Sequence, residues 1–192
     1  MKRDPAKYRR KSVRLGGYNY SQPGAYFVTI CTHNRESYFD KSPQIKQIVQ
    51  THWNRLDTRF PQIELDEFVA MPNHIHGILF IAEVGAIHEL PLQDRRKMLL
   101  PKAIGYYKMN TAKEINQLLN RTGQPFWQRN YYEHIIRNEE ELNRIGQYIR
   151  NNPLKWELDR ENPKSEYFNL DHELYWREIY ERRRNARQGL LR

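Results

Sequence analysis

Two histidines separated by one residue are the strongest chemical signal in the sequence. His74 and His76 lie in the segment MPNHIHGILFI, in which Pro-Asn is typical of a turn and the apolar run of a strand. Because side chains two residues apart on a strand point to the same face, both imidazoles face one side and Ile75 the other. Two neutral imidazoles side by side can bind one divalent cation. A metal ion at a sheet surface, with a nucleophile opposite, can cleave a phosphodiester.

A tyrosine and an asparagine one helical turn apart supply the remaining groups for such a reaction. Tyr148 and Asn152 are four residues apart near the end of an expected helix, so they share one face. The Tyr148 phenol is the candidate nucleophile, and the Asn152 side chain offers a neutral oxygen as third metal ligand. The product would be a covalent phosphotyrosine, which keeps the energy of the phosphodiester and permits rejoining. Since the pKa of a free tyrosine is about 10, attack at neutral pH requires a proton acceptor or the field of the ion.

Several of these assignments have alternatives in the sequence. Tyr131 and Tyr132 could face the site from a neighbouring strand, or they could pack in the core or stack on bases. Asn151 could replace Asn152, and Asn152 is also well placed to end its helix before a proline. The histidine pair by itself also fits two ordinary strand residues. Packing or surface positions are expected for two further histidines: His88 and His134.

Hydrophobic periodicity predicts the elements that must position these groups. Strands are predicted at four ranges: 25–32, 63–71, 74–82 and 127–136. The second and third are expected to pair as an antiparallel hairpin. Helices are predicted at four ranges: 43–58, 102–119, 138–152 with Asn138 as its N-cap, and 172–187. The order βαββαβα predicts an α+β fold, a ferredoxin-like sandwich of an antiparallel sheet with helices on one face.

Positive charge is concentrated at the N-terminus. The chain carries a formal net charge of +9, and residues 1–14 hold seven Lys or Arg against one Asp. We divide the chain into a basic N-terminal arm (1–23), a catalytic domain (24–153) with a loop or insertion at 84–102, and a partly helical C-terminal tail (154–192). A basic arm on a nearly neutral body is typical of proteins that bind a polyanion, although a solubilising tail would look similar. The candidate phosphate contacts are Arg9, Arg10, Lys11, Arg14, Arg95, Arg96, Lys97, Lys108 and Arg129.

Composition excludes several other classes of protein. No apolar run approaches the ~20 residues needed to span a membrane. The basic N-terminus is not followed by an apolar segment, so it is not a secretory signal. Cys31 is the only cysteine, which excludes intrachain disulfides and cysteine-based zinc sites and indicates a reducing cytoplasm.

Three blocks of the sequence together resemble the REP-associated tyrosine transposases, which belong to the single-tyrosine HUH transposases. The blocks are MPNHIHG at 71–77, WQRNYYEHIIR at 127–137 and YIRNNP at 148–153. They occur in the family's order and spacing, and the resemblance covers most of residues 12–160. The histidine block alone would be a weak signal, whereas the three blocks together are specific.

The resemblance implies an enzyme that cleaves and joins single-stranded DNA at repetitive palindromes folded as hairpins. It implies Mg²⁺ or Mn²⁺ on His74, His76 and Asn152, and attachment of Tyr148 to the 5′ phosphate with release of a free 3′ hydroxyl. It also implies a bacterial, nucleoid-associated protein of the cytoplasm, either a monomer or a homodimer. The main alternative is a non-catalytic regulator of the same fold that binds repeat hairpins. An RNA-binding ferredoxin-like domain would instead need exposed aromatic residues on the sheet face.

Overall fold

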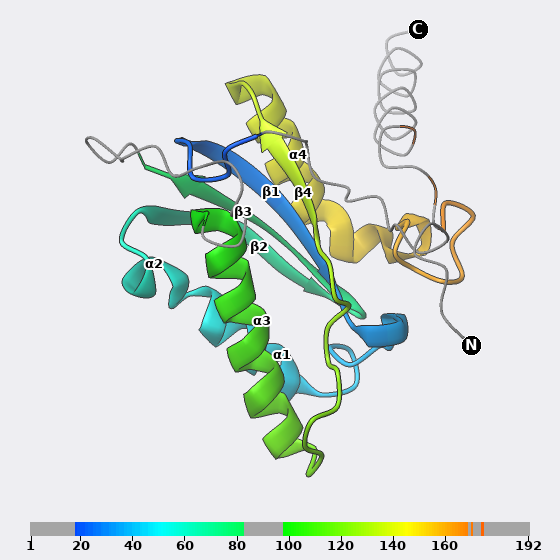
Figure 1. Ribbon diagram of the computed structural model, residues 1–192. Helices are drawn as coiled ribbons and strands as arrows, with labels where there is room; N and C mark the ends of the chain where they lie inside the picture. Colours follow the sequence, from blue (N-terminus) through cyan, green and yellow to red (C-terminus); the bar gives the residue numbers. More distant parts are fainter. Residues whose placement is uncertain (1–17, 83–97, 169, 171–173, 175–192) are drawn as a thin grey trace, which may run out of the picture.

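The computed structural model describes residues 18–82, 98–168, 170 and 174 (Figure 1). Its elements in chain order are β1 (Gly24–Cys31), η1 (His33–Arg35), α1 (Pro43–Trp53), α2 (Leu56–Arg59), β2 (Ile63–Met71), β3 (His74–Ile81), α3 (Leu99–Leu118), β4 (Tyr132–Ile136), α4 (Glu139–Asn151) and η2 (Asn152–Leu158). The predicted order βαββαβα is therefore confirmed. Apart from residue 174, the predicted helix at 172–187 lies outside the described residues.

The four strands form one antiparallel sheet in the order β2-β3-β1-β4. This is the strand order of a ferredoxin-like sandwich, and it confirms the predicted fold class. The predicted hairpin is β2 and β3, which pair from Ile63 opposite Ile81 to Met71 opposite His74. As a result the histidine strand is hydrogen-bonded on both edges. In the β1–β3 ladder, Thr29 is opposite His76.

The first face of the sheet is covered by α1 and α3, which pack side by side (Figure 1). Alternate residues of β1, such as Tyr26 and Val28, are fully buried in this core. Trp53 of α1 lies against β3 at Gly77, where an added Cβ would be only 2.4 Å from the indole ring. Glycine is needed there because the ring occupies the space of a side chain.

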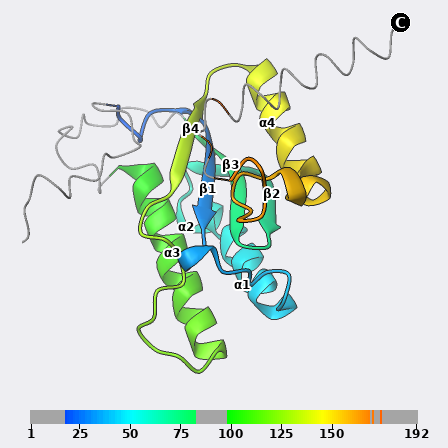
Figure 2. The same cartoon turned by 90° about the vertical axis from the view of Figure 1, so that its right-hand side faces the viewer.

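The second face of the sheet carries α4, on the opposite side from α1 and α3 (Figures 1 and 2). Phe27 of β1 packs there with Ile145, Tyr148 and Ile149 of the helix. The expectation of helices on one face therefore holds for α1 and α3 but not for α4. The sequence of β1 is consistent with a sheet covered on both faces. Seven of its eight residues are buried, and they form a nearly continuous apolar run instead of an alternating pattern.

Three element boundaries differ clearly from the sequence prediction. The helix predicted at 102–119 begins at Leu99, so the end of the loop or insertion predicted at 84–102 is helical. The helix predicted at 43–58 ends at Trp53, and a separate short helix, α2, follows. The strand predicted at 127–136 begins only at Tyr132, while Trp127 makes a single bridge to Thr32. Boundaries depend on tertiary contacts, whereas the existence of these elements depends on periodicity.

Candidate metal and nucleophile site

The two histidines of β3 face each other through their Nε2 atoms. Both point to the α4 side of the sheet, and the His74 Nε2 and His76 Nε2 atoms are 2.9 Å apart. The side chains are 0% and 2% exposed. The predicted side-by-side arrangement of the imidazoles is thus present. The sequence did not indicate that both side chains would be buried.

Each imidazole is oriented by a hydrogen bond at its other nitrogen. His74 Nδ1 lies 2.9 Å from Asn73 Oδ1, and His76 Nδ1 lies 2.9 Å from Thr29 Oγ1. Metal-binding histidines almost always have such a partner, which fixes the ring orientation and the tautomer. The sequence reasoning missed both partners, assigning Asn73 to a turn and Thr29 to a strand.

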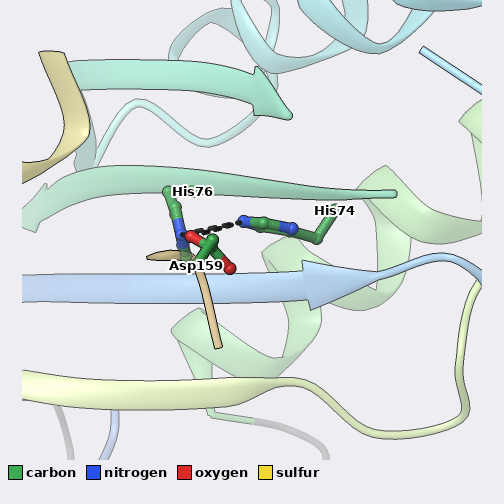
Figure 3. A group of neighbouring side chains, drawn as sticks. All are labelled: His74, His76 and Asp159. Atoms are coloured by element: carbon green, nitrogen blue, oxygen red, sulfur yellow. Dashed lines mark hydrogen bonds and ion pairs between the residues drawn. The ribbon is translucent and has the colours of Figure 1, made fainter. Parts of the chain in front are cut away.

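A buried carboxylate that the sequence reasoning also missed completes the cluster. Asp159 Oδ2 lies 3.9 Å from His74 Nε2 and 4.0 Å from His76 Nε2 (Figure 3). Among the described residues, these three side chains are the group that could hold a metal ion. In the plane of these three atoms, the point equidistant from them lies about 2.1 Å from each. This distance matches ordinary metal–nitrogen and metal–oxygen bonds.

The segment after η2 is tied to the start of β3, and this places Asp159. The backbone N–H of Glu161 donates to Asp159 Oδ1 at 2.7 Å. The Glu161 carbonyl accepts a hydrogen bond from Asn73 Nδ2 at 2.8 Å, and its carboxylate pairs with Arg35. One asparagine therefore contacts both the histidine pair and the segment that carries the carboxylate.

Burial sets the charge state of the cluster. It lowers the pKa of His74 from 6.5 to about 3, so the imidazole is neutral and able to bind a cation at neutral pH. Burial by itself would raise the pKa of Asp159. The nearby His74 and His76 rings and the Glu161 N–H outweigh it and hold the pKa of Asp159 below its usual value. The site thus combines the neutral imidazole of His74 with an ionised oxygen donor.

Tyr148 reaches the same cluster from α4. Its helix begins at Asn138, whose side chain accepts a hydrogen bond from the Glu141 N–H at 2.8 Å, which confirms the predicted N-cap. The Tyr148 Oη atom lies 3.3 Å from His76 Nε2 and donates a hydrogen bond to Asp159 Oδ2, also at 3.3 Å. The phenol oxygen is therefore in contact with two of the three candidate metal ligands.

The other predicted site residues have different surroundings. Asn152 is 2% exposed, and its amide nitrogen has no hydrogen-bond partner among the described residues. No hydrogen bond within the described part of the chain joins its side chain to His74 or His76, so its role as a ligand stays a prediction. Tyr131 belongs to the core on the α1–α3 face, whereas Tyr132 packs edge-on against Phe27 with ring centroids 6.5 Å apart. Tyr148, in contrast, contacts His76 directly, through its hydroxyl and its ring.

The predicted phosphate contacts are only partly described. Lys108 Nζ donates to the backbone carbonyls of Gln128 and Arg129, at 2.7 and 2.9 Å. It therefore anchors the segment before β4, while the Arg129 side chain is exposed. The remaining candidates lie outside the described residues: Arg9, Arg10, Lys11, Arg14, Arg95, Arg96 and Lys97.

Comparison with known proteins identifies the family. The model of the IS200-like transposase family matches residues 22–152, which include both histidines and the tyrosine. The chain belongs to this family. The predicted resemblance to tyrosine transposases is thereby confirmed at the level of the family.

Individual relatives of this transposase-family chain are also found. An uncharacterised protein of Haemophilus influenzae strain Rd is 40% identical over 167 residues, which cover 80% of this chain and 93% of the relative. A REP-associated tyrosine transposase bound to a REP hairpin is similar in structure, with 22% identity, a TM-score of 0.48 and coverage of 69% of this chain and 68% of that one. A candidate transposase of Deinococcus radiodurans has 18% identity and a TM-score of 0.42, covering 72% of this chain and 97% of that one.

No helix within the described residues combines the length and the apolar character needed to cross a bilayer.

Proposed function

We propose that this transposase-family chain is a metal-dependent endonuclease and strand transferase for single-stranded DNA, acting through a 5′-phosphotyrosine. The observation that carries the proposal is the position of the Tyr148 Oη atom, 3.3 Å from both His76 Nε2 and Asp159 Oδ2. A phenol, two imidazoles and a carboxylate converge from three separate parts of the chain. Such a convergence supports chemistry better than it supports a binding role alone.

The proposed ion site uses His74 Nε2, His76 Nε2 and Asp159 Oδ2. Asn152, which the sequence predicts as an oxygen ligand, is kept in the proposal as a further donor. This set of two imidazole nitrogens and one carboxylate oxygen can hold a divalent ion. Mg²⁺ or Mn²⁺ is proposed because the three sequence blocks resemble those of the tyrosine transposases. When bound there, the ion would polarise a phosphate oxygen and offset the charge that develops on the phosphorus.

The residues of the chain supply the nucleophile and its orientation. Tyr148 Oη forms a bond to phosphorus while the bond from phosphorus to the 3′ oxygen breaks, so the DNA stays attached through its 5′ phosphate. Asp159 Oδ2 accepts the hydrogen bond of the phenol and so orients its oxygen. The phenol proton is lost to solvent, because the lowered pKa of Asp159 makes this carboxylate a weak base. The 3′ oxygen takes up a proton from solvent and leaves as a hydroxyl. Because the phosphotyrosine retains the energy of the bond, a second DNA end can reverse the reaction and be joined.

Hairpins of repetitive palindromic DNA are the proposed substrate, on the strength of the three sequence blocks described above. The REP-associated transposase of similar structure was itself determined with a REP hairpin. The proposal also places the protein at the bacterial nucleoid, in the cytoplasm. A non-catalytic hairpin-binding regulator remains the competing function, and the following experiment separates the two.

Replacing the proposed nucleophile tests the function directly. Tyr148→Phe keeps the ring that packs against Phe27 and His76, at centroid distances of 6.3 and 5.3 Å, and removes only the hydroxyl. We expect the variant to bind hairpin DNA but to form no product and no denaturant-resistant protein–DNA adduct. Tyr132→Phe, in β4, is the matched control. This variant should bind hairpin DNA, cleave it and form the covalent adduct.

The assay uses single-stranded oligonucleotides from the flanks of the gene, labelled at one end, with Mn²⁺ or Mg²⁺. A 3′ label should appear in the adduct and a 5′ label in the released strand, because the tyrosine holds the 5′ phosphate. Normal cleavage by Tyr148→Phe would refute the assignment. Hairpin binding without any adduct from the unaltered protein would favour the regulator.

A further inference from the structure

The Asn73 side chain fixes the tautomer of His74. Its Nδ2 donates to two backbone carbonyls, at 2.8 Å to Glu161 and 3.3 Å to Arg35. Since carbonyls can only accept, the amide nitrogen must face them and Oδ1 must face His74. Oδ1 also can only accept, so His74 Nδ1 carries the hydrogen of their 2.9 Å bond. In the neutral ring, Nε2 then has no hydrogen and presents a lone pair.

His76 is not fixed in this way. The Thr29 hydroxyl, 2.9 Å from His76 Nδ1, can act as donor or as acceptor. At the other end of the ring, His76 Nε2 faces the lone pair of His74 Nε2 at 2.9 Å and the Tyr148 oxygen at 3.3 Å. Two bare nitrogens at 2.9 Å would repel each other. In a neutral His76 ring without a bound cation, the hydrogen therefore resides on Nε2, and Thr29 donates to Nδ1.

Metal binding requires the opposite tautomer of His76. A histidine that binds a cation through Nε2 must keep that atom free of hydrogen. The hydrogen can then reside on Nδ1, because the Thr29 hydroxyl can rotate and accept it. His74 has no such alternative. The Asn73 amide is held by two carbonyls and cannot turn to present a donor to His74 Nδ1.

We propose that the two histidines have different roles: His74 is a permanently prepared ligand, and His76 is a tautomeric switch operated through Thr29. When a divalent ion enters, the hydrogen of His76 moves from Nε2 to Nδ1 and Thr29 Oγ1 changes from donor to acceptor. Thr29 is thus a positioning residue. The inference rests on the proposed function only in that the site binds a divalent ion.

Nitrogen NMR of the uniformly ¹⁵N-labelled protein reads the tautomers directly, without reference to activity. In metal-free protein, long-range ¹H–¹⁵N spectra should show His74 with its hydrogen on Nδ1 and His76 with its hydrogen on Nε2. After addition of Mg²⁺, or of diamagnetic Zn²⁺ as a stronger imidazole binder, His76 should change to Nδ1–H and His74 should keep its tautomer. The inference is overturned if His76 carries Nδ1–H before metal is added, if His74 is the ring that changes, or if neither ion alters the spectrum.

Two variants of Thr29 test its part in the switch. Thr29→Val has nearly the same shape but can neither donate nor accept a hydrogen bond, so His76 Nδ1 loses its partner in both forms and nothing holds the ring in the tautomer that binds metal. We expect its Zn²⁺ affinity in calorimetry to fall by about tenfold or more, the usual effect of removing such a partner. Thr29→Ser keeps the hydroxyl and should bind like the unaltered protein. Equal affinity of the valine variant would overturn the role of Thr29, and the spectra of the unaltered protein decide the switch even if that variant fails to fold.

The same measurements distinguish this inference from the proposed function. A protein whose His76 changes tautomer but which forms no DNA adduct would refute the nuclease and retain the switch. A protein that forms the adduct while His76 keeps one tautomer throughout would refute the switch and retain the nuclease.

Discussion

Loss of the Asp159 charge should weaken metal binding strongly while the fold is retained. The carboxylate is 0% exposed, and its Oδ2 atom is one of three atoms with a common point about 2.1 Å away. Asp159→Asn keeps the size of the side chain and an oxygen for the 2.7 Å bond from the Glu161 N–H. The substitution therefore removes mainly the negative charge. Because the His74 imidazole is neutral at neutral pH, the substitution does not leave that ring as an unpaired buried charge.

The size of the effect follows from the role of the side chain. Removing a residue that merely supports a ligand costs about 10- to 100-fold in affinity, so loss of a direct anionic ligand should reach the upper end, about 100-fold. At an ion concentration 100 times the dissociation constant, the unaltered protein gains about 2.7 kcal/mol of stability. At that concentration the variant would gain only about 0.4 kcal/mol. For a chain of this size, the rise in melting temperature should fall from about 5–10 °C to about 1–2 °C.

Thermal unfolding with and without Mn²⁺ measures this difference. Asn152→Ala is the informative companion, because it removes the oxygen ligand that the sequence predicts. If Asp159→Asn retains the full thermal shift while Asn152→Ala loses it, the carboxylate is not a ligand and the reasoning from the three distances is refuted.

Two further predictions concern stability without metal. Because burial lowers the pKa of His74 to about 3, below its unfolded value of 6.5, the unfolded chain takes up the proton first as the pH falls. Urea unfolding should therefore show full stability above about pH 6.5 and a loss of up to about 1.4 kcal/mol per pH unit below it, and His74→Gln should flatten that slope. Gly77→Ala should destabilise by about 1–3 kcal/mol, since its Cβ would lie 2.4 Å from the Trp53 ring. Gly105→Ala, with no atom within 4 Å of the new Cβ, should be neutral or stabilising; equal costs for both alanines would contradict the packing argument.

Periodicity and local chemistry account for what could be predicted from the sequence. The apolar runs predicted every strand, and the Asn138 cap followed from its own short-range pattern. The spacing of His74 and His76 was enough to place both rings on one face. These features depend on neighbours within a few residues along the chain.

Asp159 could not be predicted in this way. Nothing in its local sequence distinguishes it from other aspartates, and no spacing rule joins it to the histidines. It reaches them because Glu161 is tied to Arg35 and Asn73, contacts between segments far apart in sequence. Thr29 was missed for a related reason, since its partnership with His76 depends on strand register, which the sequence did not define.

The position of β3 has a consequence for how the site responds to thermal motion. β3 is hydrogen-bonded to a strand on each side, so the histidines sit in the part of the molecule that opens only when the sheet as a whole unfolds. Tyr148 and Asp159 instead come from a helix and a following segment laid on one face of that sheet, joined to it by side-chain packing and a few polar contacts. The two histidines of the proposed ion site are thus built into the most durable layer of the protein. The proposed nucleophile and the proposed carboxylate ligand belong to a layer that can loosen without disturbing the histidines, as the entry of a DNA strand would require.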